Sequence, residues 1–168
     1  LELGLKGVKL HPDIQKFSLD SEGSMSILGL CDRYELPVLI HAGDKRFQNS
    51  NPDNIIPVLE RFPNLTMIGA HFGGFSVWDE ALERLSKYPN YYVDCSSSMF
   101  AMDDEKVMAL IAGWGTDRIL FATDYPMWSP AAERKRYEGL PLTEVQKFQM
   151  DYQNAMRILK LSPEILKD

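Results

Sequence analysis

The chain has 168 residues, with a formal net charge of −6, 45% hydrophobic residues and 25% charged residues, which is the balance of one soluble globular domain. The acidic charge argues against a broad nucleic-acid-binding surface, and no apolar run approaches the roughly 20 residues that cross a bilayer. The two cysteines, Cys31 and Cys95, lie in apolar segments, so we expect reduced, buried thiols in a cytoplasmic protein.

Short apolar runs alternate with helical patterns along the chain. The runs predict strands at 6–11, 37–41, 65–71, 91–95 and 118–123. The patterns between them predict helices that begin near Ser21, Pro52, residue 76 and Asp103, and a last helix over 142–159. Polar loops, expected to form a pocket, are predicted at 12–20, 44–51 and 125–141. This alternation implies βαβ units and a parallel sheet.

Two architectures fit five βα units, a doubly wound sheet and a (β/α)₈ barrel. A barrel usually takes about 250 residues, so five units in 168 residues would form an incomplete barrel. The sequence begins Leu-Glu-Leu, without an initiator methionine, and enters its first strand almost at once. We therefore expect a stretch of a longer barrel protein.

Polar groups gather where the predicted strands end. The three histidines, each at a strand end and 30 residues from the next, are His11, His41 and His71. Asp94 and Asp124 end the last two strands, and Lys9 shares a strand face with His11. Carboxyl ends of parallel strands collect ligands and catalytic groups. Imidazoles and carboxylates that converge there are the ligand set of a catalytic zinc or similar ion, which activates water near neutral pH.

Each of these residues also has a structural interpretation. A single histidine at a strand end is more often a hydrogen-bonding group than a ligand. Asp44 could cap a turn after His41, and Asp94 could hold a loop or a ligand imidazole. The serines 96–98 suit a turn or helix cap better than a nucleophile, since no Gly-Xaa-Ser-Xaa-Gly elbow is present. Spacing alone leaves the metal site and the structural interpretation both open.

Four strings carry a family resemblance, and they occur in the same order as in that family. They are Gly-Val-Lys-Leu-His-Pro (7–12), Pro-Val-Leu-Ile-His-Ala-Gly (37–43), Ile-Gly-Ala-His-Phe-Gly-Gly (68–74) and Leu-Phe-Ala-Thr-Asp-Tyr-Pro (120–126). The closing Tyr-Gln-Asn-Ala-Met-Arg-Ile-Leu (152–159) matches as well. Together they resemble the amidohydrolase-related metal-dependent TIM-barrel hydrolases, the branch of the amidohydrolase superfamily that includes aminocarboxymuconate-semialdehyde decarboxylase.

The resemblance implies an α/β fold in which the five strands correspond to strands four to eight of a TIM barrel. Residues 1–168 would then be a single domain, the C-terminal part of that barrel. It implies His41 as a metal ligand, Asp124 as a ligand and proton shuttle, and His71 as a ligand, catalytic acid or electrostatic stabiliser. Lys9 falls where binuclear relatives carry a carboxylated lysine, and His11 is an additional candidate ligand.

The implied cofactor is one divalent ion, with zinc as the first choice and manganese as an alternative. The family's first strand carries a His-Xaa-His pair that completes the metal site, and this sequence has no such pair. We therefore expect the 168-residue chain by itself to bind zinc weakly.

Three functions follow from the resemblance. The leading hypothesis is a hydrolase in which metal-activated water attacks a C–N or C–O bond of a small molecule, with Asp124 taking the proton and His71 stabilising the oxyanion or protonating the leaving group. The second is non-oxidative decarboxylation of an aromatic or unsaturated acid, whose carboxylate Lys45, Arg46 or Arg134 would bind.

The third hypothesis is a non-catalytic half-barrel that acts in binding or assembly, because an incomplete barrel leaves open sheet edges. In every case we expect a small-molecule substrate or ligand, no nucleic-acid or membrane partner, and room for a homo-oligomer.

Overall fold

The computed structural model describes residues 2–162 and 164. Its five strands are β1 (Val8–Leu10), β2 (Val38–Ile40), β3 (Met67–Gly69), β4 (Tyr91–Asp94) and β5 (Ile119–Leu120). All neighbours pair in parallel, in the sequential order β1-β2-β3-β4-β5. A doubly wound sheet reverses its strand order at a switch point, and this sheet has no reversal. Of the two architectures, the sheet therefore matches an arc of a barrel.

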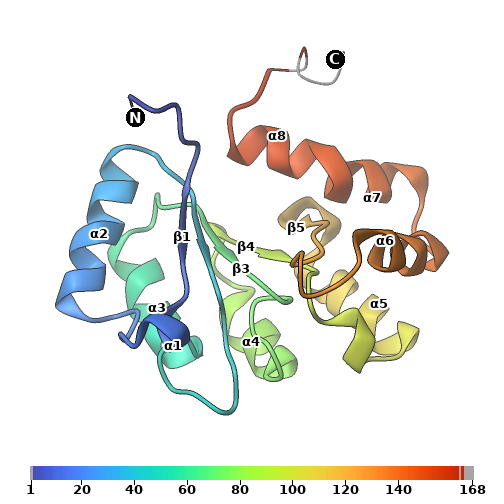
Figure 1. Cartoon of the computed structure of the whole chain (residues 1–168), viewed down its shortest axis with the longest axis horizontal. Coiled ribbons are helices and arrows are strands. Elements are labelled where there is room, and N and C mark those ends of the chain that lie inside the picture. Colours follow the sequence, from blue (N-terminus) through green and yellow to red (C-terminus); the bar gives the residue numbers. More distant parts are fainter. Residues whose placement is uncertain (1, 163, 165–168) are drawn as a thin grey trace.

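Helices follow the strands around this arc (Figure 1). They are α1 (Pro12–Gln15), α2 (Glu22–Arg33), α3 (Pro52–Arg61), α4 (Trp78–Leu85), α5 (Asp104–Trp114), α6 (Pro130–Gly139), α7 (Glu144–Phe148) and α8 (Asn154–Ile158), with a π-helix, η3 (Gln149–Gln153), between the last two and two 3₁₀ turns, η1 (Met99–Ala101) and η2 (Thr116–Arg118). In the described part of the chain, no helix has both the length and the apolar character needed to cross a membrane.

Local sequence signals explain where several helices begin. The Ser21 hydroxyl accepts a hydrogen bond from Ser24 N, and the Asp103 carboxylate accepts one from Lys106 N at 2.8 Å. These caps satisfy backbone donors that have no partner within the helix. Pro52 stands at the first turn of α3, where its missing N–H costs nothing.

Segment 125–141 is not the continuous loop that the sequence predicts, because it contains α6. Pro130 follows the N-cap Ser129, which is a helix-start signal. The helix is strongly polar and buries only Glu133 and Tyr137, so it lacks the apolar stripe by which amphipathic helices are recognised. The predicted loop 12–20 likewise contains the short helix α1.

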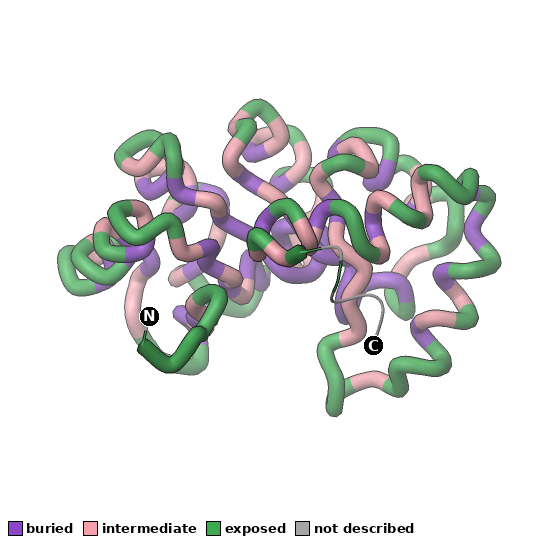
Figure 2. Tube along the Cα trace, turned by 90° about the horizontal axis from the view of Figure 1, so that it is seen from above, coloured by how far each residue is buried: buried purple, intermediate pink, exposed green. Residues whose placement is uncertain are grey.

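The sheet has one face against the helices and one facing the inside of the arc. The helix-facing side chains, which are fully buried, are Val38, Ile40, Met67, Tyr91, Val93 and Ile119. Strand register and alternation put Lys9, Leu39, Ile68 and Tyr92 in one row on the other face. Figure 2 shows the buried stretches running through the middle of the molecule, with the exposed stretches mainly at its periphery. The core thus lies between sheet and helices, and it fixes the positions of the strand ends.

The last helix turns a different side to the core than a regular 3.6-residue period suggests. A regular period would put Val145, Phe148 and Tyr152 on one apolar side of the helix, yet they are 70%, 52% and 45% exposed. The π-helix Gln149–Gln153 inserts an extra residue into one turn and so shifts the faces on either side of it. Asn154 comes to face inward, where its Nδ2 donates to the backbone oxygens of Thr116 (2.8 Å) and Ile119 (2.6 Å).

The buried carboxyl of Glu133 supplies a test of this packing. The side chain is 7% exposed and its Oε2 has no hydrogen-bond partner among the described residues. Burial raises the pKa of Glu133 above its ordinary value, although Arg136 lies nearby. The folded state therefore favours the protonated acid, so the ionised form lowers stability once the pH exceeds the ordinary value of about 4.3.

We predict that Glu133→Gln raises the free energy of unfolding at pH 7 by about 1 kcal/mol, and that this gain disappears as the pH falls below about 4. Urea denaturation at the two pH values measures the difference. Glu83→Gln, at an exposed position on α4, is the control and should change stability by less than about 0.5 kcal/mol. An equal gain for Glu133→Gln at both pH values would contradict the prediction.

Candidate active site

A cavity of about 360 Å³ lies at the carboxyl ends of the strands. Residues that follow each of the five strands line it, namely His11, His41, His71, Ser97 and Asp124. The three predicted pocket loops each contribute a side chain, respectively Ile14, Arg46 and Trp128. A larger cavity of about 460 Å³, beside Leu36, Thr66 and Tyr92, includes no histidine in its lining. The smaller cavity is therefore the candidate active site, because it is the one lined by histidines.

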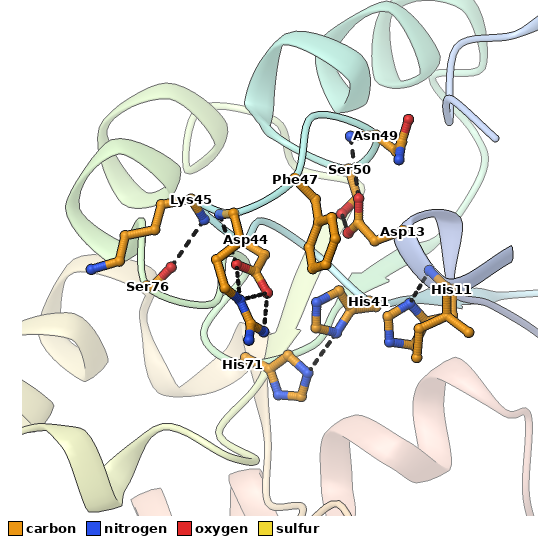
Figure 3. A network of polar contacts seen from close by, with 12 residues as sticks. His11, Asp13, His41, Asp44, Lys45, Phe47, Asn49, Ser50, His71 and Ser76 are labelled. Carbon is orange, nitrogen blue, oxygen red and sulfur yellow. Dashed lines mark hydrogen bonds and ion pairs between the residues drawn. The ribbon is translucent and has the colours of Figure 1, made fainter. Parts of the chain in front are cut away.

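The three histidines meet at the edge of this cavity (Figure 3). The rings of His11 and His41 are stacked, with centroids 4.1 Å apart and an interplanar angle of 9°. His41 Nδ1 lies 3.0 Å from His71 Nε2. The pKa of His41 falls to about 3, chiefly because the ring is buried and also because other basic groups surround it. The imidazole is therefore neutral at ordinary pH, which is the form that binds metals.

Asp94 and Ser96 orient the His71 ring. The Ser96 hydroxyl lies 2.6 Å from Asp94 Oδ1 and donates its hydrogen to that carboxylate. The Ser96 oxygens, hydroxyl and backbone carbonyl, both lie 3.0 Å from His71 Nδ1 and accept from it. We assign the hydrogen to Nδ1 on these grounds, which leaves the Nε2 lone pair of His71 facing His41. Asp94 thus holds the ring in place, one of the two roles open to it from sequence.

Backbone strain concentrates at the same strand ends. His71 has φ 63°, Ser97 has φ 47° and Asp124 has φ 60°. Residues other than glycine rarely adopt this left-handed region, at a cost of about 1–3 kcal/mol each. Such conformations persist where surrounding contacts impose them, and they cluster at functional sites. Here they turn three polar side chains from the strand ends toward the cavity lining.

Ser96 and Ser97 hold side chains that line the cavity, a role that the sequence interpretation does not include. Ser97 Oγ donates to Asp124 Oδ2 at 2.7 Å and accepts from Trp128 Nε1 at 2.7 Å. The sequence favours turn or cap residues at these positions, and the hydrogen-bond partners found in the structure lie 25–31 residues away along the chain. The available signal was position, because a run of hydroxyls directly follows a strand end.

The donor atoms fit a divalent metal ion. One ligand atom each from His11, Asp13 and His41 can lie within 4.8 Å of one another, so these residues form a possible metal site. The 3.0 Å between the nitrogens of His41 and His71 is slightly shorter than the separation of neighbouring tetrahedral zinc ligands, which at about 2.0–2.1 Å from the metal lie about 3.3–3.4 Å apart. Asp13, which the sequence interpretation did not single out, is buried and accepts from Asn49 N and Ser50 Oγ.

The remaining predicted residues fall into two groups. Asp124 and Lys9 line the cavity, and burial lowers the pKa of Lys9. Of the three cations considered for a substrate carboxylate, Arg46 alone lines this cavity, where Asp44 Oδ2 lies 2.6 Å from its Nη2. Lys45 is absent from the lining, and Arg134 on α6 pairs with Asp151 and Glu138.

Sequential parallel strands with imidazoles and a carboxylate around one cavity at their carboxyl ends are typical of barrel-type α/β proteins. Comparison with known families identifies the chain more closely. Residues 1–161 match the family model described as Amidohydrolase. The chain belongs to this family.

Solved structures confirm the fold as part of a TIM barrel. An uncharacterised TIM-barrel protein, Bb4693 from Bordetella bronchiseptica, superposes with a TM-score of 0.81 at 24% identity, over 95% of this chain and 59% of that one. 5-Carboxyvanillate decarboxylase LigW from Sphingomonas paucimobilis gives 0.74 at 18% identity, over 96% and 60%. 2,6-Dihydroxybenzoate decarboxylase from Rhizobium gives 0.66 at 16% identity, over 86% and 57%.

This chain therefore spans less than two thirds of the length of these three structures. A search of curated proteins found no match.

Ser96→Ala tests whether the contacts around His71 position it. The variant removes the hydroxyl between Asp94 and the imidazole, so we predict a 10- to 100-fold loss of metal affinity or turnover, the usual effect of disturbing such a partner. Titration with Zn²⁺ or Mn²⁺, followed by calorimetry, measures the affinity. Ser24→Ala is the control. It removes a buried hydroxyl on α2 that has no hydrogen-bond partner among the described residues. Unchanged metal binding and turnover in Ser96→Ala would refute this role.

Proposed function

We propose that this chain carries the site of a metal-dependent, non-oxidative decarboxylase of a small aromatic or unsaturated acid. One observation carries the proposal. The cavity combines imidazoles and a carboxylate with an apolar wall that includes Phe75, Phe100 and Trp128, and with the guanidinium of Arg46. A flat, anionic molecule needs both kinds of surface.

The solved relatives support the same reaction class. Two of them are decarboxylases, of 5-carboxyvanillate and of 2,6-dihydroxybenzoate. A third, dihydroxybenzoic acid decarboxylase from Polaromonas, holds manganese and the inhibitor 2-nitroresorcinol, with a TM-score of 0.64 at 16% identity. These proteins act on aromatic acids or bind their analogues, which is why we favour decarboxylation over hydrolysis for this chain.

In this proposal His41 and Asp124 hold one divalent ion, zinc or manganese, with His71, His11 and Lys9 as further candidate donors. The ion acts as a Lewis acid toward substrate oxygens when bound. The neutral state of His41 and the Nε2 lone pair of His71 suit this task. Arg46, whose Nε and Nη2 pair with Asp44, keeps Nη1 free of hydrogen bonds within the described chain and can bind an anionic group.

Decarboxylation replaces a carboxylate by hydrogen, so the site must supply a proton. We assign this step to Asp124, whose Oδ2 is held by Ser97. The protonated acid transfers its hydrogen to the carbon that bears the carboxylate. The bond to the carboxylate then breaks, its electron pair remains with the substrate, and carbon dioxide leaves. His71 faces the same space and stabilises charge there, since its Nε2 can accept a proton.

Hydrolysis is the second candidate, because the family model that matches the chain is described as Amidohydrolase. The same residues would serve, with Asp124 accepting a proton from water and His71 stabilising the oxyanion. The non-catalytic half-barrel is the third, since the described sheet has β1 and β5 as open edge strands.

Product analysis separates these candidates. The chain, supplied with Zn²⁺ or Mn²⁺, is incubated with 2,6-dihydroxybenzoate or 5-carboxyvanillate. We expect release of carbon dioxide together with the decarboxylated phenol. Cleavage of ester or amide substrates without carbon dioxide would instead establish hydrolysis. Tight, stoichiometric zinc in the isolated chain would contradict the weak binding that we expect from the missing His-Xaa-His pair.

His71→Asn tests the assignment of His71 in the active enzyme. We predict that turnover falls by about 10²- to 10⁴-fold, the typical contribution of a proton-transferring or charge-stabilising side chain, while metal content stays near normal. Steady-state kinetics and elemental analysis of the same sample give both values. Parallel losses of metal and turnover would make His71 a required ligand, and undiminished turnover would remove it from the mechanism.

A further inference from the structure

Three side chains form a continuous hydrogen-bonded chain at the cavity, from Trp128 through Ser97 to Asp124. Both links are 2.7 Å. Their direction is fixed by chemistry, because an indole N–H can only donate. Ser97 Oγ therefore accepts from Trp128, and it gives its own hydrogen to the carboxylate oxygen Asp124 Oδ2. One hydroxyl thus holds two residues that line the same cavity.

Trp128 is also clamped through its ring. Phe100 stacks on it, with centroids 4.4 Å apart and an interplanar angle of 26°. Both rings line the cavity, and Phe100 is half exposed. The indole is therefore fixed at its edge by a hydrogen bond and on one face by Phe100, and the surface that remains is available to a bound molecule. A fixed, flat aromatic surface favours a flat ring over a puckered one.

Ser97 is held rigidly and connects Asp124 with Trp128. It is 6% exposed, and its backbone lies in the left-handed region at φ 47°. Asp124, at the other end of the link, has φ 60°. Both side chains are thus aimed by unusual backbone conformations, and the hydrogen bond between them couples two strand ends, those of β4 and β5.

We infer that Ser97 is a positioning residue that sets Asp124 and Trp128 at once, so that the cavity selects substrates with a planar ring and presents them to Asp124. The part that concerns turnover rests on the proposed function. The part that concerns ring selection does not, because it is measurable by binding alone.

The first experiment measures ring selection by calorimetry with two monoanionic probes, benzoate and cyclohexanecarboxylate. The wild-type chain should bind benzoate roughly 3- to 10-fold more tightly. Trp128→Leu should bring the two dissociation constants within twofold, and Trp128→Phe should keep part of the preference because it keeps a flat ring. Phe148→Leu is the matched control, since it breaks an exposed aromatic pair with Tyr152 outside this cavity.

The second experiment replaces the connector. Ser97→Gly accepts the left-handed backbone without strain and removes the whole CH₂OH side chain, whereas Ser97→Ala removes only the hydroxyl. With Trp128 still present, we expect the preference for benzoate to fall by at least half and turnover to fall 10- to 100-fold. Ser97→Ala is the second variant, and Ser24→Ala on α2 is the control. Adding Trp128→Phe to Ser97→Gly should lower turnover by less than the product of the single effects, because both act through one link.

Two results would overturn the inference. One is a Ser97→Gly protein that keeps its full ring preference and its turnover within twofold. The other is an unchanged preference for benzoate in Trp128→Leu. Failure of the decarboxylase proposal looks different: the wild-type chain would still prefer benzoate and lose that preference in Ser97→Gly, yet consume no aromatic acid.

Discussion

The site depends on the hydrogen bonds that the buried carboxylate of Asp94 accepts. Its Oδ1 accepts hydrogen bonds from His71 N, Ser96 N and Ser96 Oγ. These three donors satisfy the hydrogen-bonding capacity of a buried polar group that would otherwise destabilise the fold. The carboxylate therefore fixes both the backbone of His71, which lies in the left-handed region, and the hydroxyl that directs the His71 ring. Without it, the strained turn after β3 would lose the contacts that impose it.

The parallel sheet supplies the second constraint, because it brings distant parts of the sequence to one edge. His41 N donates to Leu10 O at 3.0 Å, and Ala70 N donates to Ile40 O at 2.9 Å. These bonds continue the ladder beyond the regular strands and carry the register into the loops that bear His11, His41 and His71. The stacking of His11 on His41 and the 3.0 Å contact of His41 with His71 follow from that register.

Much of this arrangement was predictable, for identifiable reasons. The order of strands and helices follows from apolar periodicity and from start signals such as Ser21 and Pro52, which act within a few residues. The histidines stand out because they follow each other at intervals of 30 residues, at the ends of the first three strands. Helix α6 was missed because it buries almost nothing apolar. The hydrogen bonds of Ser97 could not be predicted, because its partners, Asp124 and Trp128, follow another strand. Contacts between residues so far apart in the chain leave no signal in the local sequence.

The serines at 96 and 97 also explain how a small site can be pre-organised. His71 is directed through Ser96 and Asp124 through Ser97, so adjacent residues after β4 control groups from β3 and β5. A catalytic constellation works best when its members are held before the substrate arrives, since reorientation during reaction costs free energy. His41 is held differently, by the ring of His11 on one side and the nitrogen of His71 on another. The two kinds of contact therefore have different effects. Ring contacts keep the candidate metal ligands close together. Hydrogen bonds from serine hydroxyls orient the residues that would transfer a proton or stabilise charge.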